Sequence, residues 1–146
     1  MKLENSIDSS HLLSSNGISR TKFRTDLLNL FLTQKRSLSI EDILIHFNNS
    51  INKVTVYRSL DSFEEKGLIH QVPDSNNLKR YSLCREDECS TSSHNHNHGH
   101  FICYSCNQTY CIEDVKSPDI TGLKGFYIKE FKLTLEGYCK DCAINY

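Results

Sequence analysis

Two pairs of cysteines near the C-terminal end have the spacing of metal ligands. The pairs Cys103-Tyr-Ser-Cys106 and Cys139-Lys-Asp-Cys142 are separated by 32 residues. Each pair turns the chain so that two thiolates can face one ion, and two pairs complete a tetrahedral shell of four sulfur atoms. A closed shell of this kind stabilises a fold and leaves no position for catalysis, so we predict structural zinc. The alternative, a redox-active pair or unligated buried cysteines, suits one pair better than two pairs that flank strands.

A second group of possible ligands lies directly before the first cysteine pair. His94, His96, His98 and His100 alternate with small or polar residues. In an extended segment, residues two apart point to the same side, so neighbouring imidazoles can chelate one ion. A solvated tract that binds metal only weakly is the alternative.

Two residues earlier in the chain can add ligands to this group. His70 and Cys84 lie in the two predicted strands of a hairpin. On its own, such a histidine is more often structural, and a lone cysteine is more often a small core residue. Both adjoin the histidine stretch, however, so we predict a second metal site that joins the two halves of the chain.

Composition limits the classes of protein to consider. A chain of 146 residues has room for one ordinary domain or two small ones, which excludes a large multi-domain enzyme. Neither a long apolar run nor a signal peptide is present, so we expect a cytoplasmic protein without a membrane span. Seven cysteines without an export signal indicate metal binding rather than disulfides. The net charge of -1 means that DNA binding must be argued from local motifs.

The composition also divides the chain near Cys84. Up to and including this residue there are 11 basic and 9 acidic side chains, a balance of +2, whereas the remainder has 6 and 9, a balance of -3. All seven cysteines lie from Cys84 onward. We therefore expect an N-terminal tail and domain over residues 1–84, a histidine-rich hinge over 85–100 and a zinc-binding domain over 101–146.

Hydrophobic spacing predicts the elements of the first domain. Apolar residues recur at helical intervals over 21–32, 40–47 and 53–66, with an N-cap at Ser39 and a stop signal at Gly67. Alternating runs at 68–72 and 79–83 surround a turn-rich segment and predict a β-hairpin. Three helices followed by a hairpin indicate a winged helix-turn-helix, and hence an α+β protein.

The second domain is predicted to consist mainly of strands. Short strands are expected at 101–103 and 109–112, around the first cysteine pair, and a longer one at 127–137 with a single buried face. Pro118, Gly122 and Gly125 favour a loop rather than a helix between them.

The third predicted helix is the one that would enter the major groove of DNA. Its polar residues alternate with buried ones, and a basic cluster lies at the start of the first predicted helix. An ordinary solvated helix face is the alternative explanation for such charges. The candidate DNA contacts are Arg20, Lys22, Arg24, Lys53, Thr55, Tyr57 and Arg58.

Together these residues resemble the ferric uptake regulator (Fur) family of metal-dependent repressors, from about Ile18 to Cys142. Taken singly, Thr-Val-Tyr-Arg is weak, but the whole set in this order and spacing is highly specific. The motifs are Arg-Thr-Lys-Phe-Arg at 20–24, Thr-Val-Tyr-Arg at 55–58, Glu-Lys-Gly-Leu-Ile at 65–69, His-Gly-His-Phe-Ile-Cys-Tyr-Ser-Cys at 98–106 and the closing Cys139-x-x-Cys142. The resemblance implies a homodimer that binds an A/T-rich palindromic operator in double-stranded DNA. It assigns the four paired cysteines to structural zinc and His98 and His100 to a regulatory metal.

Departures from the family pattern favour zinc as the sensed metal. Ser37 and Ser82 stand where iron sensors carry a histidine and a glutamate ligand. His70 and Cys84 match ligand positions of zinc sensors, and Cys111 replaces a carboxylate by a softer thiolate. We therefore expect a regulatory zinc on His70, Cys84, His98 and His100, with Cys111 and His96 as alternates. The short, Pro/Gly-rich segment 115–125 also departs from the helix that relatives carry there, which weakens the inference of a dimer through the strands.

These features predict a zinc-responsive repressor of metal homeostasis genes rather than an enzyme. The His-Glu-x-x-His pattern of a zinc hydrolase is absent. Two alternatives are an iron- or peroxide-responsive member of the same family and a zinc-buffering or adaptor protein that does not bind DNA.

Overall fold

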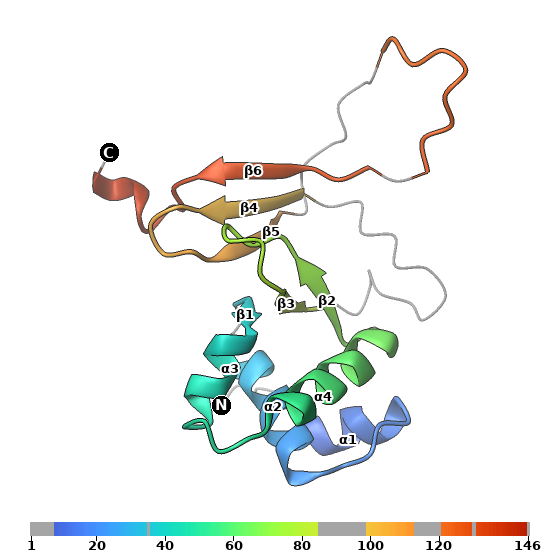
Figure 1. The fold of residues 1–146 in the computed structure, drawn as a ribbon, viewed down its shortest axis with the longest axis vertical. Helices are drawn as coiled ribbons and strands as arrows, with labels where there is room; N and C mark the ends of the chain where they lie inside the picture. The colour runs from blue at the N-terminus through green and yellow to red at the C-terminus, as the bar shows by residue number, and fades with distance from the viewer. Residues whose placement is uncertain (1–7, 35, 85–98, 113–120, 130, 146) are drawn as a thin grey trace, which may run out of the picture.

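The computed structural model describes residues 8–34, 36–84, 99–112, 121–129 and 131–145, which form two parts (Figure 1). The N-terminal part, here called the head, has four helices and a three-stranded sheet, and the C-terminal part, the body, has a second three-stranded sheet. The predicted α+β class, with a helical N-terminal domain and a strand-rich C-terminal domain, is confirmed. No helix of the described residues is long and apolar enough to cross a membrane.

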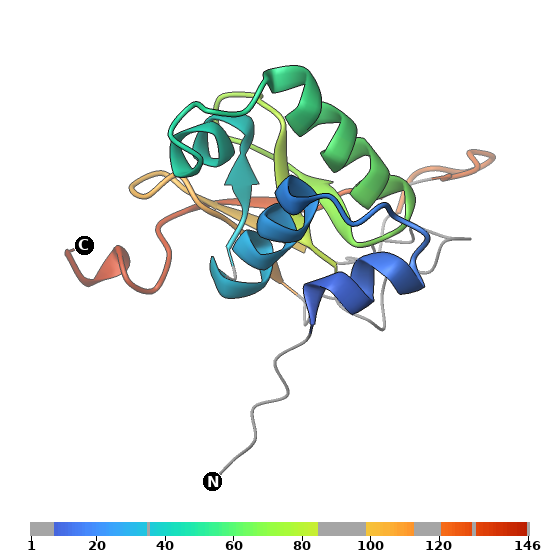
Figure 2. The same cartoon turned by 90° about the horizontal axis from the view of Figure 1, so that it is seen from below.

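The helices and strands of the described residues follow one another along the chain in this order. In the head they are α1 (Ser9–Ser15), α2 (Lys22–Gln34), β1 (Leu38–Ser39), α3 (Ile40–His46), α4 (Lys53–Glu65), β2 (Ile69–Val72) and β3 (Arg80–Leu83). In the body they are β4 (Gly99–Cys103), β5 (Thr109–Ile112), β6 (Thr134–Gly137) and the 3-10 helix η1 (Ala143–Asn145). The helices lie at the end of the molecule away from the body sheet (Figures 1 and 2).

Three head helices occupy the predicted segments because their local signals agree with their packing. Ser39 and Asp42 form a reciprocal capping box at the start of α3, and the Asn52 side chain caps α4. Gly67, with φ +73°, follows the end of α4 in the left-handed conformation that glycine adopts without strain. The apolar faces of these helices form one core, with Leu27, Leu28, Phe31, Ile43, Val56, Leu60 and Phe63 all nearly inaccessible.

Helix α1 adds to the head an element that the sequence does not predict. The Asp8 side chain accepts a hydrogen bond from the Ser10 amide at its N-terminus. Leu13 is fully buried and belongs to the same core as α2 and α4. With seven residues, α1 is too short for a clear hydrophobic period, so its stability depends on packing against α2.

The head sheet forms the predicted hairpin and adds one short strand. Its order is β1-β3-β2, with antiparallel pairing throughout, and the register places His70 opposite Ser82 and Val72 opposite Arg80. The hairpin extends from the helices toward the body (Figure 1).

The body sheet has the order β5-β4-β6, in which β4 pairs antiparallel with β5 and parallel with β6. Strand β4 begins at Gly99, within the segment expected as hinge. The predicted strand over 127–137 is wrong in extent, because among its described residues only Thr134–Gly137 forms a strand. Its predicted buried face is also wrong: Tyr127 is 92% exposed and Leu135 41%, since within one chain nothing among the described residues covers that side. The described part of the predicted loop, residues 121–125, contains no helix.

Candidate metal centres and DNA-reading surface

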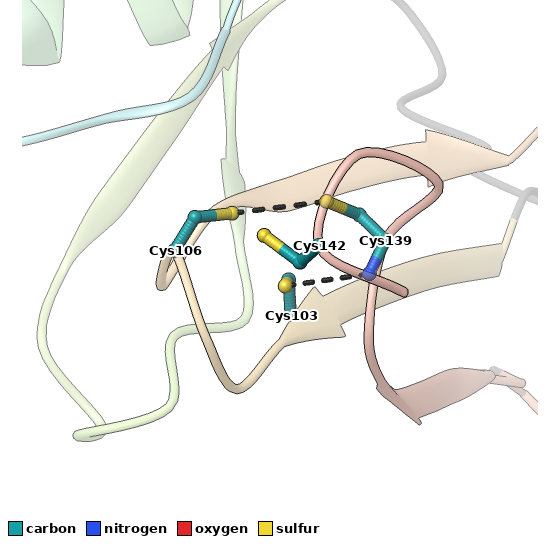
Figure 3. A group of neighbouring side chains, drawn as sticks. All are labelled: Cys103, Cys106, Cys139 and Cys142. Atoms are coloured by element: carbon teal, nitrogen blue, oxygen red, sulfur yellow. Dashed lines mark hydrogen bonds between the residues drawn. The ribbon is translucent and has the colours of Figure 1, made fainter. Parts of the chain in front are cut away.

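The two cysteine pairs come together at one end of the body sheet. Cys103 ends β4, Cys106 lies in the turn after it, and Cys139 and Cys142 follow β6 (Figure 3). The four sulfur atoms lie within 4.8 Å of one another, and those of Cys106 and Cys139 are 4.0 Å apart. A tetrahedral zinc with Zn–S bonds of about 2.3 Å requires sulfur separations of about 3.8 Å. The donor set therefore fits structural zinc in both chemistry and spacing.

Contacts within this cluster lower the pKa of two thiols and raise the pKa of a third. Backbone donors, that of Cys106 above all, lower the pKa of Cys103 to about 6. A hydrogen bond from the Tyr110 hydroxyl is the main cause that lowers the pKa of Cys139. Although a contact with the Ser105 hydroxyl favours the Cys142 thiolate, the neighbouring thiols and burial raise the pKa of Cys142 to about 12. Four sulfurs this close cannot all be thiolates without a cation between them, which is the electrostatic requirement of a metal site.

A second cluster joins the head to the body. His70 of β2, His100 of β4 and Cys111 of β5 each offer a ligand atom, and these three atoms lie within 4.8 Å of one another. The His70 Nε2 and Cys111 Sγ atoms are 3.5 Å apart. Two ligands of a tetrahedral zinc, at about 2.0 Å for nitrogen and 2.3 Å for sulfur, lie about 3.5 Å from each other. The cluster thus has the donors and the spacing of a metal site built from three strands.

Cys84 contacts the opposite side of the His70 ring. Its sulfur lies 3.3 Å from His70 Nδ1, whereas Cys111 faces Nε2. In a neutral imidazole one nitrogen carries a proton and only the other can bind a metal. In this ring orientation His70 can therefore bind an ion beside Cys111 through Nε2 or an ion beside Cys84 through Nδ1, but not both at once. The predicted ligands His98 and His96 lie outside the described residues.

The predicted DNA contacts of α4 lie on its exposed face. Lys53, Thr55, Tyr57 and Arg58 are all exposed, while Val56 and Leu60 of the same helix are buried in the core. Sequence analysis missed Val54, which is 53% exposed beside Tyr57 and offers an apolar contact of the kind that recognises a thymine methyl group. The signal available in the sequence was a valine that lies off the apolar face formed by Val56, Leu60 and Phe63.

The three basic residues before and within α2 differ in their exposure and in their contacts. Arg20 is exposed, and Lys22 is exposed but forms an ion pair of 2.7 Å with Asp26. Arg24 instead points toward α4, where it donates to the hydroxyls of Ser59 and Ser62, and it also donates to Ser19 at 2.8 Å. Its guanidinium therefore connects α2 with the helix that carries the candidate base contacts.

Residues 15–136 match the profile of the Ferric uptake regulator family. The chain belongs to this family. As a Fur-family protein it is a metal-dependent, DNA-binding regulator of transcription and not an enzyme. The family predicted from the sequence motifs is confirmed.

Relatives named for iron and for zinc are both similar to this Fur-family chain. The ferric uptake regulation protein of Staphylococcus epidermidis is 30% identical over 146 residues, covering 94% of this chain and 96% of that protein. The structure of the ferric uptake regulator of Francisella tularensis with iron is 28% identical, with a TM-score of 0.58 over 87% of this chain and 96% of that chain. A zinc uptake regulator complexed with zinc and DNA is 23% identical, with a TM-score of 0.62 over 92% of this chain and 90% of that one.

Proposed function

We propose that this Fur-family chain is a zinc-responsive repressor of metal homeostasis genes. The observation that carries the proposal is the cluster of His70, His100 and Cys111, which draws ligands from both head and body. Two imidazoles and a thiolate are borderline-to-soft donors, which favour zinc over the iron(II) and manganese(II) that oxygen-rich sites prefer. A ligand set that spans the two parts makes their relative orientation depend on the metal.

The regulatory ligands are His70, His100 and Cys111, and a fourth comes from Cys84, His98 or His96. Of these candidates, Cys84 is the described residue next to His70, although it faces the other ring nitrogen. The cluster of Cys103, Cys106, Cys139 and Cys142 holds a separate structural zinc. The proposal therefore gives each chain one structural and one regulatory zinc.

Regulation follows from the placement of the ligands. When bound, the regulatory zinc supplies a cross-link between the strand β2 of the head and the strands β4 and β5 of the body. The chain's own residues then hold α4 in one orientation, with Tyr57, Arg58 and Val54 facing outward to the bases and Lys53 to the phosphate backbone. Zinc loss would widen the range of head orientations and weaken operator binding.

The active species is proposed to be a homodimer on an A/T-rich palindromic operator, acting in the cytoplasm, where its operator DNA lies. Exposed apolar side chains on and before β6 support the dimer: Phe126 is 72% exposed and Ile128 49%, in addition to Tyr127 and Leu135. An exposed apolar surface of this kind is typical of a protein interface. A second copy of the chain would cover it and place two α4 helices for successive major grooves.

The test is operator binding by fluorescence anisotropy against buffered free zinc, with the structural zinc retained. Cys111→Ser and His70→Ala should each abolish the zinc response, because each removes a ligand that joins head and body. His11→Ala, in the exposed part of α1, is the matched control and should respond as wild type. Operator affinity that stays constant after removal of the regulatory metal would contradict the proposal.

Metal content identifies the two sites independently of DNA. Elemental analysis should find two zinc ions per wild-type chain and one after mild chelation. Cys106→Ser should lose the chelator-resistant zinc, whereas Cys111→Ser should lose the labile one. The same number of resistant zinc ions in both variants would contradict the assignment.

An iron-responsive regulator is the second candidate, and the staphylococcal relatives named for ferric uptake favour it. A competition titration of the regulatory site with Zn(II), Fe(II) and Mn(II) separates the two. Zinc should bind most tightly if the thiolate of Cys111 is a ligand. A zinc-buffering protein would instead retain its zinc affinity and show no operator binding that depends on Tyr57 and Arg58.

A further inference from the structure

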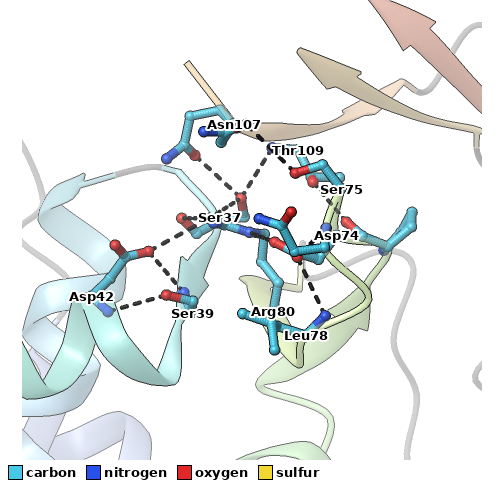
Figure 4. Close-up of polar contacts among 12 residues, drawn as sticks. Ser37, Ser39, Asp42, Asp74, Ser75, Leu78, Arg80, Asn107 and Thr109 are labelled. Carbon is cyan, nitrogen blue, oxygen red and sulfur yellow. Dashed lines mark hydrogen bonds and ion pairs between the residues drawn. The ribbon is translucent and has the colours of Figure 1, made fainter. Parts of the chain in front are cut away.

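Head and body also meet at a buried group of polar side chains that contains none of the proposed metal ligands. Figure 4 shows this group, which lies where the turn between β2 and β3 approaches the start of β5. We call it the interdomain polar cluster. Its members are Ser37, Asp74 and Arg80 of the head and Gln108 and Thr109 of the body.

On the head side, Arg80 fixes the position of Ser37. The Arg80 side chain is 8% exposed, and its charge is balanced within the head by Asp74 at 2.9 Å and Asp42 at 3.5 Å. Its Nη1 atom donates to the carbonyl oxygen of Ser37 at 3.2 Å and to the hydroxyl at 3.3 Å. The buried, charge-paired Arg80 therefore fixes the Ser37 hydroxyl through contacts within the head alone.

Three hydrogen bonds of Ser37 and Thr109 then cross from head to body, and the Ser75 hydroxyl donates a fourth to the Asn107 side-chain oxygen at 3.5 Å. The Ser37 hydroxyl accepts from the Thr109 amide at 3.2 Å and donates to the Gln108 side chain at 3.2 Å. With the bond from Arg80, its one donor and two acceptor positions are all used. The Thr109 hydroxyl donates to the carbonyl oxygen of Pro73 at 2.7 Å. Ser37 and Thr109 are 1% and 3% exposed, so separating head and body would break bonds between groups shielded from water.

The cluster and the proposed regulatory site share their supporting elements. Arg80 and Val72 form the register pair at the far end of the hairpin that carries His70. Thr109 and Cys111 lie two residues apart on β5, so their side chains point to the same side of that strand. A contact that fixes Thr109 against the hairpin consequently fixes Cys111 with respect to His70.

We propose that the interdomain polar cluster holds head and body together without a metal and so preorganises the regulatory site around His70 and Cys111. Ser37 and Thr109 are positioning residues in this proposal. Zinc then binds ligands that are already close, so its apparent affinity increases with the fraction of molecules in the closed arrangement. The inference rests on the proposed regulatory site, but its first readout requires neither zinc in that site nor DNA.

The first experiment measures amide hydrogen exchange in the full chain with the regulatory metal removed and the structural zinc retained. The Thr109 amide donates to Ser37 across the boundary and reports the contact directly. In wild type it should exchange at least about tenfold more slowly than in Ser37→Ala. Amides of α4, such as that of Leu60, should be equally protected in both proteins, which separates opening of the cluster from unfolding of the head.

The second experiment measures zinc affinity by chelator competition. Thr109→Val removes the bond to Pro73 and keeps a β-branched shape, whereas Thr109→Ser keeps the hydroxyl. Zinc binding to the regulatory site should weaken by about tenfold in Thr109→Val and remain near wild type in Thr109→Ser. Thr33→Val, which removes a hydroxyl-to-carbonyl bond within α2, is the matched control.

Two results would overturn the proposal. One is an unprotected Thr109 amide in the metal-depleted wild type, since head and body would then separate freely. The other is equal zinc affinity in wild type, Ser37→Ala and Thr109→Val, because the cluster would then have no effect on the regulatory site. A metal response to iron rather than zinc would contradict the proposed function while leaving the exchange result unchanged.

Discussion

At the scale of single residues, Arg24 makes contacts within the head in addition to being a predicted DNA contact. Its three hydrogen bonds to serine hydroxyls connect α2, α4 and the segment before α2, and Ser59 among these partners is 2% exposed. Hydrogen bonds to a charged group contribute more than those between neutral groups. Arg24 therefore holds α4 in place through contacts within the head. Lys53, at the N-terminal end of α4, is exposed to solvent, where a phosphate could contact it.

Substitution of these two residues should separate structure from DNA contact. Arg24→Ala should lower the free energy of unfolding by about 1–2 kcal/mol, because two serine hydroxyls on α4 lose their partner. Its operator affinity should fall with little change in salt dependence. Lys53→Ala should leave stability unchanged and reduce the salt slope by about 1. Denaturant unfolding and anisotropy at several salt concentrations measure both, and the reverse pattern would make Arg24 the phosphate contact.

At the scale of elements, α1 completes the head core although it lies outside the motif-bearing part of the chain. Leu13 is fully buried, and Leu12 beside it is only partly buried. Leu13→Ala should lower the free energy of unfolding by about 2–4 kcal/mol, since it removes buried methyl groups and leaves a cavity. Leu12→Ala should lower the free energy of unfolding by a smaller amount. Urea unfolding followed by circular dichroism measures both, and equal small losses would show that α1 does not pack on α2 in solution.

The elements that the sequence predicted correctly are those with strong local signals. Helices α2, α3 and α4 have apolar periods, the capping box at Ser39 and the glycine stop at Gly67, so their existence requires no knowledge of partners. Helix α1 and strand β1 are too short to show a period, and their formation depends on tertiary contacts. The strand predicted over 127–137 failed for the opposite reason, because its apolar alternation has no covering surface within one chain.

The candidate sites also differ in how far the sequence could predict them, and again local signals decide. The four-cysteine site was predictable because each pair is local and only two pairs had to meet. The second site combines residues from β2, β4 and β5, and the sequence named His70, His100, Cys84 and Cys111 without determining which atoms face one another. The opposed positions of Cys84 and Cys111 on the His70 ring depend on the register of β2 and β5. The polar cluster at Ser37 likewise depends on contacts between residues about 70 positions apart.

At the scale of the whole molecule, the exposed apolar surface of the body predicts self-association. Leu135→Asp would place a charge within this surface and should shift the chain from dimer toward monomer, because a buried interface does not accept an unpaired carboxylate. Asn29→Asp, which adds the same charge at an exposed position of α2 in the head, should leave the dimer intact. Sedimentation equilibrium measures the difference. A dimer that persists unchanged in Leu135→Asp would place the interface elsewhere.

The two proposed ligands of the whole molecule, regulatory zinc and operator DNA, must influence each other reciprocally. If zinc strengthens operator binding by a given factor, operator DNA must strengthen zinc binding by the same factor, typically about 5–150-fold. In a variant of α4 that no longer binds DNA, such as Arg58→Ala, added operator DNA should leave the zinc affinity unchanged, while the zinc affinity without DNA stays at the wild-type value. Competition with a zinc chelator in the presence and absence of operator duplex measures one factor, and anisotropy at fixed free zinc measures the other. Zinc affinity that is the same with and without operator DNA would mean that the ion at His70, His100 and Cys111 is not coupled to the orientation of α4, whatever its structural effect on the strands.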